Sequence, residues 1–356
     1  MHNRQVVRNI ARLSCLALLA IPLLALKVGS APQCVSPGAY ASSSALFRIR
    51  TEPAPARQKP QTVIADKTIK VSVSLVTVPV MVSDKQGNYV PGLRESDFHI
   101  FENNVEQAID KLIPEAEPFN VALMIDSSGS THFKFEEMQD AALAFIDALR
   151  PQDRIMIVSF DSEIYSDSDF TEDRAQLRQS ILRTHSTGGK TRLYDALERV
   201  MTERLNRVPG RKAIILFTDG VDNESLQAGS SDTIVTIEKS DVLVYAIQFD
   251  TRKDGMSDRF HVPPPPGYVS FDTLYGRAVR YLRALSSHSG GRLYNAGTIA
   301  SINEAFKQIA DELPRQYTLC YYPTNQQRDG SYRRIRVAVN RAGVKIRART
   351  GYRAGK

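Results

Sequence analysis

The sequence contains no glycine-rich phosphate-binding loop, no Ser-His-Asp set and no zinc-binding motif, so three common routes to enzyme chemistry leave no signature in it. Its longest apolar run, residues 13–26, is interrupted by Pro22. A transmembrane helix needs ~20 apolar residues, so this run is too short for a comfortable span. Three cysteines are present, and a Cys34–Cys320 disulfide is chemically allowed in an oxidising compartment, although their spacing does not require it.

The composition is that of an ordinary globular protein, with 42% hydrophobic and 24% charged residues. A length of 356 residues leaves room for two domains of roughly 100–200 residues each. The formal net charge of +7 includes four cations in residues 1–31, and about +3 remains without them. A charge this small does not predict nucleic-acid binding.

The first 31 residues have the pattern of an export signal. Arginines 4, 8 and 12 precede the apolar run, and the small residues GSA offer a cleavage point after Ala31. We therefore expect a periplasmic, cell-surface or secreted protein without a transmembrane span once the signal is cleaved. An uncleaved N-terminal membrane anchor is the alternative.

Short strands flank the central part of the chain. Residues 32–66, rich in Pro, Ala, Ser and Gln, predict a flexible linker, and residues 67–116 predict a β module. The apolar alternation there slips by one residue near Val76, which predicts a bulge or a strand break. Strands return in residues 314–356. Because each group is small for a stable core, we expect the two groups to pack together as one β-sandwich-like module.

Residues 117–313 alternate strands with helices, which predicts an α/β domain with a doubly wound, mainly parallel six-stranded sheet of order 3-2-1-4-5-6. The third strand is expected to pair with the second as a hairpin. A long polar loop, 251–271, separates the fifth and sixth strands. The predicted strands are 121–125, 155–160, 164–170, 213–218, 241–249 and 291–296, and the predicted helices include 135–149, 174–183, 193–205 and 302–313.

Oxygen-bearing side chains gather where these strands end. Asp126 ends the first strand and Asp219 follows the fourth, and these strands are expected to be neighbours where the winding reverses. Ser128, Ser130 and Thr191 come from loops at the same edge. Two carboxylates and three hydroxyls form an all-oxygen set that suits Mg²⁺, Mn²⁺ or Ca²⁺ rather than zinc or copper. Few anionic donors would leave the cation able to accept an external carboxylate.

Residues 119–312 resemble the von Willebrand factor type A domain, whose metal-ion-dependent adhesion site reads D-x-S-x-S, then a Thr, then an Asp after an apolar strand. Here the motif is DSSGS at 126–130, Thr191 in GGKTRLYDAL, and Asp219 in FTDG. The resemblance implies Mg²⁺ or Mn²⁺ as the metal, and a protein partner that offers an Asp or Glu. The flanking stretches VSVSLVTVPVMVSDKQGNYVPGL, YTLCYYPTNQQRDGSYRRIRVAV and RTGY are similar to a bacterial exported group of von Willebrand factor A-related proteins.

Three residues are candidates for the rim that meets a partner. Lys190 stands between the glycine pair and Thr191, where a direct GGT is common in the family. It is a charge that favours anionic partners, a charge that weakens metal binding by repulsion, or a solvated loop residue. His132 follows the DSSGS motif, and Asp222 lies in a DNE run that is either a second ion site or a hydrophilic turn. Asp195 is expected in the first turn of its helix, where the dipole favours an anion.

Two other functions compete with cation-dependent adhesion. A phosphatase of the haloacid-dehalogenase type also uses a strand-end aspartate and Mg²⁺, but it needs a second Asp two residues on, where this chain has Ser128. We therefore do not expect an enzyme. A structural envelope scaffold with a vestigial metal site is the other alternative. The basic residues of the last strands either bind acidic glycans or lipid headgroups or, as we expect, are solvated strand faces; they are Arg333, Arg334, Arg336, Lys345, Arg347 and Arg349.

Overall fold

The structure is a computed structural model that describes residues 75–113, 117–130, 135–249 and 269–355. The predicted export signal and linker, Cys34, His132 and most of the 251–271 loop lie outside these ranges. Among the helices of the described ranges, none is both long and apolar enough to span a membrane.

A six-stranded sheet forms the centre of the α/β domain. Its order is β10-β9-β8-β5-β6-β7, and every pairing is parallel except that of β6 with β7. This is the predicted order 3-2-1-4-5-6 with the predicted hairpin. The strands are β5 (Phe119–Asp126), β6 (Arg154–Phe160), β7 (Ile164–Ser166), β8 (Arg211–Thr218), β9 (Leu243–Phe249) and β10 (Leu293–Ala296).

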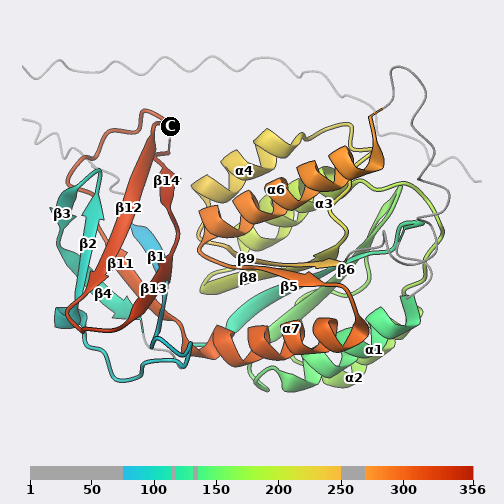
Figure 1. Cartoon of the computed structure of the whole chain (residues 1–356), viewed down its shortest axis with the longest axis horizontal. Helices are drawn as coiled ribbons and strands as arrows, with labels where there is room; N and C mark the ends of the chain where they lie inside the picture. Colours follow the sequence, from blue (N-terminus) through green and yellow to red (C-terminus); the bar gives the residue numbers. More distant parts are fainter. Residues whose placement is uncertain (1–74, 114–116, 131–134, 250–268, 356) are drawn as a thin grey trace, which may run out of the picture. The chain divides into compact units, whose positions relative to one another are not determined.

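Helices cover both faces of this sheet (Figure 1). One layer consists of α1 (Phe135–Ala148), α2 (Arg174–Arg183) and α7 (Ile299–Glu312), and the other of α3 (Leu193–Arg199), α4 (Ser230–Lys239) and α6 (Phe271–Ser289). All of β5 is buried because its side chains alternate between these layers. Leu123 and Ile125 join the cluster of the first layer, whereas Ala122 and Met124 join that of the second.

Several predicted boundaries were wrong. The strand expected at 164–170 ends at Ser166, because the side chains of Asp167 and Ser168 accept the backbone N–H groups of Ser159 and Ile157 and interrupt the ladder. The helix expected at 193–205 ends as an α-helix at Arg199 and continues through a π-helical turn, η3 (Val200–Arg204), and a 3-10 turn, η4 (Leu205–Arg207).

The helix expected at 302–313 instead spans Ile299–Glu312, because the Thr298 hydroxyl caps it by accepting the N–H of Ser301. A 3-10 turn, η6 (Leu313–Arg315), then leads out of the α/β domain. Helices α4 and α6 were not predicted at all.

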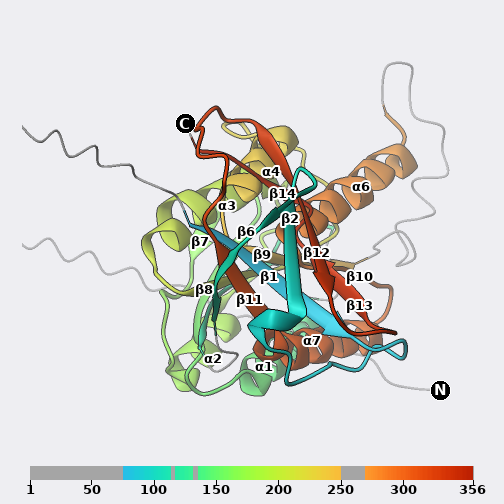
Figure 2. The same cartoon turned by 90° about the vertical axis from the view of Figure 1, so that its left-hand side faces the viewer.

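Strands from both ends of the chain build the second module, as expected. One sheet has the order β13-β1-β11-β4 and the other β14-β12-β2-β3. In Figure 2 the blue to teal strands interleave with the red ones. The strands are β1 (Val76–Ser83), β2 (Phe98–Glu102), β3 (Val105–Gln107), β4 (Ile109–Ile113), β11 (Tyr317–Tyr321), β12 (Tyr332–Val339), β13 (Lys345–Ala348) and β14 (Gly351–Arg353), and η1 (Glu95–Asp97) precedes β2.

Local sequence explains the pairing in this module. Val76, Val78, Val80 and Val82 are all buried, so the apolar alternation that begins at Val76 faces the core. Strands β2 and β3 are joined by Asn103 and Asn104, both with positive φ, which asparagine tolerates in a tight hairpin.

Two of the basic residues expected on solvated strand faces are buried. Arg333 is 2% exposed and Arg349 is 5% exposed. Arg333 pairs with the buried carboxylate of Glu102 at 3.2 Å, and the hydroxyls of Tyr321 and Tyr352 donate to the same carboxylate at 2.9 and 2.8 Å. This network crosses the module from β2 to β11, β12 and β14 and needs its carboxylate, because a buried charge without a partner is strongly destabilising.

We predict that Glu102→Ala lowers the free energy of unfolding by ~3–5 kcal/mol, because it leaves the Arg333 guanidinium without its counter-charge. The matched control is Glu106→Ala in β3, whose pair with His99 is exposed and is expected to contribute less than ~1 kcal/mol. Urea unfolding followed by circular dichroism measures both. Equal losses in the two variants would contradict the structural role of the buried pair.

Candidate metal and ligand site

The predicted site residues converge at the carboxyl edge of the central sheet. Strands β5 and β8 are adjacent and parallel, and the order of the sheet reverses between them. Asp126 is the last residue of β5, and Asp219 follows the last residue of β8, Thr218. Both aspartates are almost completely buried, at 0% and 1% exposed.

Hydrogen bonds join the two strand ends. The Thr218 hydroxyl donates to Oδ2 of Asp126, and the backbone N–H of Ser128 donates to Oδ1 at 3.1 Å. The hydroxyl oxygens of Ser128 and Ser130 lie 3.2 Å apart, and the Ser130 side chain hydrogen-bonds Asp219. The structure therefore brings together four of the five predicted donors.

The electrostatics of the two carboxylates are unfavourable for a pair of anions. Burial raises the pKa of Asp126, the nearby charge of Asp219 raises it further, and together they move it to about 7. Burial also raises the pKa of Asp219. The two groups thus interact as like charges that water does not screen.

Thr191, the fifth predicted donor, lies in a loop fixed against both strand ends. It is 3% exposed, and its backbone N–H donates to Asn223 Oδ1 at 2.8 Å. Its carbonyl accepts the N–H groups of Asn223 and Glu224 in the loop after β8. On the other side, the Gly129 N–H donates to the Gly189 carbonyl at 2.9 Å.

Sequence reasoning missed a third strand-end aspartate, Asp161, which follows β6. It is 1% exposed; its Oδ2 accepts the Thr187 hydroxyl and its Oδ1 accepts the N–H of Glu163. Asp161 thereby holds the loop that carries Thr191. The signal was present in the sequence, because RIMIVSFD ends in an acid like the strands before Asp126 and Asp219.

Asp195 lies in the first turn of α3, as expected, but its main task is to hold the loop after β8. Its carboxylate accepts the N–H groups of Leu226, Gln227 and Ala228 and pairs with Arg192 at 3.0 Å. Although burial opposes it, these hydrogen bonds lower the pKa of Asp195.

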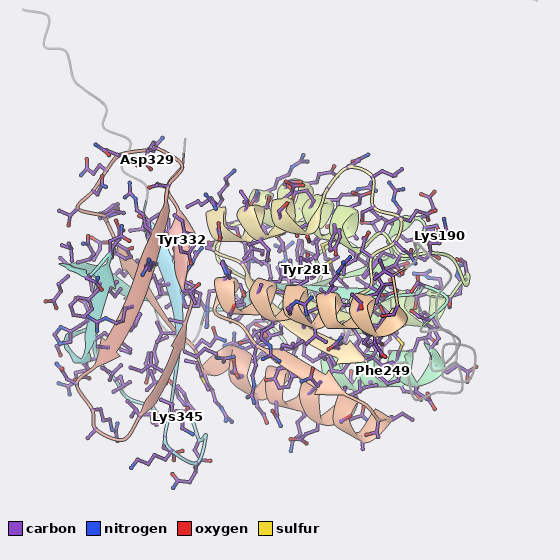
Figure 3. The ribbon with its side chains drawn as sticks, turned by 45° about the horizontal axis from the view of Figure 1, so that its top comes forward. Lys190, Phe249, Tyr281, Asp329, Tyr332 and Lys345 are labelled. Atoms are coloured by element: carbon purple, nitrogen blue, oxygen red, sulfur yellow. The ribbon has the colours of Figure 1, made fainter. Side chains whose placement is uncertain are left out.

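Two of the predicted rim residues, Lys190 and Asp222, lie in the described ranges, and their side chains have different partners. Figure 3 shows Lys190 projecting at the outer edge of the α/β domain, and its Nζ lies 3.5 Å from Glu224 Oε1. Its side chain is 66% exposed, so the pair is weak. Asp222 accepts the backbone N–H of Ser225 within its own loop and that of Tyr194 in the first turn of α3.

The donor chemistry fits a hard divalent cation. In the described ranges, no three His, Cys, Asp or Glu side chains are grouped so that they could hold a metal ion. The candidate site instead combines two carboxylates with hydroxyls. Its buried like charges are a direct physical reason for a cation, because positive charge between Asp126 and Asp219 would offset their repulsion.

Residues 121–221 match the family model of the von Willebrand factor type A domain. This part of the chain is a von Willebrand factor type A domain. The matched range contains all five predicted donors of the site. No curated protein matches the chain.

Several solved structures are similar to the chain at low identity. A von Willebrand factor type A protein from Catenulispora acidiphila is 13% identical, with a TM-score of 0.44 and 72% of each chain covered. Proximal thread matrix protein 1 from the mussel byssus, with zinc in its MIDAS motif, is 16% identical, with a TM-score of 0.44; 60% of this chain and 49% of that chain are covered. The vWF domain of the pilus tip protein Mfa5 from Porphyromonas gingivalis is 16% identical, with a TM-score of 0.41; 55% of this chain and 94% of that chain are covered.

We predict that Asp126→Asn stabilises the cation-free type A domain at pH 8 and changes little at pH 4. The folded-state pKa of about 7 exceeds the ordinary 3.8, so the folded protein binds more protons than the unfolded chain between these values. Stability of the cation-free wild type therefore falls as pH rises through this window, by up to ~1.4 kcal/mol per pH unit. Urea unfolding in EDTA at pH 4, 6 and 8 measures the difference, and a difference independent of pH would contradict the prediction.

We also predict that Gly129→Ala loosens the loop that carries Thr191. A Cβ at position 129 would lie 2.8 Å from the Gly188 carbonyl oxygen, and overpacking of this kind costs ~1–3 kcal/mol. Hydrogen exchange in residues 186–192 should accelerate roughly 5- to 150-fold. Gly297→Ala is the control, because a Cβ there meets nothing within 4 Å. Unchanged exchange in the Gly129 variant would show that the two loops are not coupled.

Proposed function

We propose that this protein is an exported binding module that captures an acidic residue of a protein partner through a divalent cation. Asp126, Ser128, Ser130, Thr191 and Asp219 would hold the cation, with Mg²⁺ or Mn²⁺ as the first candidates and Ca²⁺ as the next. The observation that carries the proposal is the pair of buried, mutually repelling carboxylates at the edge where two hydroxyl-bearing loops meet.

The chain's own residues have distinct tasks in this proposal. Asp126 and Asp219 supply the negative charge, whereas the serine and threonine hydroxyls supply neutral oxygen donors. A bound divalent cation would supply a coordination position for an external carboxylate. Thr218 orients Asp126 through its hydroxyl hydrogen bond, and Asn223 fixes the backbone of Thr191.

The competing functions lack a comparable observation. In a phosphatase with Asp126 as nucleophile, the residue two positions on would be the acid or base, and here it is Ser128, whose hydroxyl does not ionise near neutral pH as a carboxyl group does. A scaffold with a vestigial site gives no reason for keeping two repelling carboxylates buried. Export remains an expectation from residues 1–31.

A calorimetric titration with Mg²⁺ and then Mn²⁺ tests the proposal. We expect one binding event in the wild type and a loss of affinity of at least ~100-fold in Asp126→Asn, which removes an ionised ligand without changing its size. Asp140→Asn is the matched control because Asp140 is exposed on α1, outside the site. Equal heats in wild type and Asp126→Asn would refute the assigned site.

The partner's chemistry needs its own probe. At saturating Mg²⁺, the peptide acetyl-Gly-Asp-Gly-amide should shift amide resonances of residues 128–130 and 189–192, whereas the Asn analogue should not. The same shifts without Mg²⁺ would show that the acid does not bind through the cation. Hydrolysis of p-nitrophenyl phosphate by the wild type but not by Asp126→Asn would favour the enzyme.

A further inference from the structure

A cavity opens near the candidate site, alongside α3. Its volume is about 330 Å³, within the ~300–1,000 Å³ range of ligand pockets. Arg192 lines it and directly follows Thr191 in the chain, and Glu163 lines it from the turn after β6. The cavity and the candidate site therefore share one loop.

The charges that line this cavity do not cancel. Arg192 pairs with Asp195, and Arg199 pairs with Glu203 at 3.4 Å. The carboxylates of Glu163 and Glu198 also line the cavity, and no cationic side chain of the described residues forms an ion pair with either. The cavity thus carries a net charge of about −2, which a cationic ligand would offset.

The two carboxylate oxygens of Glu198 differ in their hydrogen bonds. Its Oε1 accepts the Thr236 hydroxyl from α4 at 3.0 Å. Its Oε2 is shielded from solvent and has no hydrogen-bond donor among the described residues. A carboxylate oxygen that is removed from water and left without a donor is costly. Because Oε2 is shielded even from water, a cationic ligand in the cavity would stabilise it through its charge and not through a direct hydrogen bond.

The walls of the cavity favour a side chain over a metal ion. Ile164, which is half-buried, and Thr202 offer apolar surface for an aliphatic stem. Gln227 and the carboxylates offer hydrogen-bond acceptors for its charged head. The acids are also too dispersed for a metal, since no three acidic or other metal-ligating side chains of the described ranges form a group that could hold one.

We propose that this cavity accepts a lysine or arginine side chain of the protein partner. The inference rests on the proposed function only for the identity of the partner: its acidic residue enters the candidate site, and its basic residue enters this cavity. The partner is thereby recognised by two opposite charges, one on each side of the loop that carries Thr191 and Arg192.

The probe for the cavity is N-acetyl-arginine amide, and its control is N-acetyl-citrulline amide, which has nearly the same shape without the charge. Amide resonances of residues 192–203 in the isotope-labelled full chain report binding. We expect millimolar binding of the arginine probe only, weakened at least ~10-fold in the Glu163→Gln/Glu198→Gln double variant. Asp126→Asn should bind it within about twofold of wild type, which separates this proposal from the metal site.

Three results would overturn the proposal: equal binding of citrulline, unchanged arginine binding in the double variant, or displacement of arginine by Ca²⁺ in the Asp126→Asn background. Loss of Mg²⁺ binding with retained arginine binding would instead refute only the metal site.

Peptides acetyl-Asp-(Gly)n-Arg-amide, with one to six glycines, test the shared partner. At saturating Mg²⁺ at least one should bind more tightly than its citrulline counterpart, and a series without such a peptide would contradict joint recognition.

Discussion

The repulsion between two buried carboxylates is the constraint on which this end of the molecule depends. Asp126 and Asp219 are held near each other because β5 and β8 are adjacent and parallel, so their carboxyl ends coincide. The surrounding hydrogen bonds from Thr218, Ser128 and Ser130 reduce the cost of burying these charges but bring no positive charge. The fold itself therefore leaves an excess of negative charge at the site, which a cation would offset.

The split β module constrains the opposite end of the central sheet. Because the α/β domain interrupts the sandwich, the chain must enter at β5 and leave through η6 in nearby positions. Arg211, at the start of β8, donates to the carbonyls of Glu117, Leu313 and Gln316 and lies 4.1 Å from the ring centre of Phe119. One buried guanidinium thus ties the entry and the exit together, which fixes the end of the sheet opposite the candidate site.

The strand order could be predicted from sequence because apolar runs that end in turn residues mark the buried strands. The helices were harder. In α4, SSDTIVTIEK has β-branched residues that favour strands, and it is helical because Ile237 packs into the second layer. In α6, long basic side chains interrupt the apolar stripe of Leu282 and Leu285. Tertiary packing, and not local sequence preference, therefore determines that both segments are helical.

In the site, too, features set by strand order could be predicted from the sequence, and features set by contacts between loops could not. Asp126 and Asp219 are read from strand ends, so their proximity follows from topology. The roles of Asp161 and Asn223 depend on loops that meet only in the folded chain, and no spacing in the sequence reports which backbone N–H or hydroxyl each will accept. Asp222 illustrates the point: its position beside the site suggested a partner contact, but its carboxylate is occupied by Tyr194 and Ser225. Loop acids therefore have to be sorted by the donors that occupy their carboxylates before any of them is assigned to a ligand.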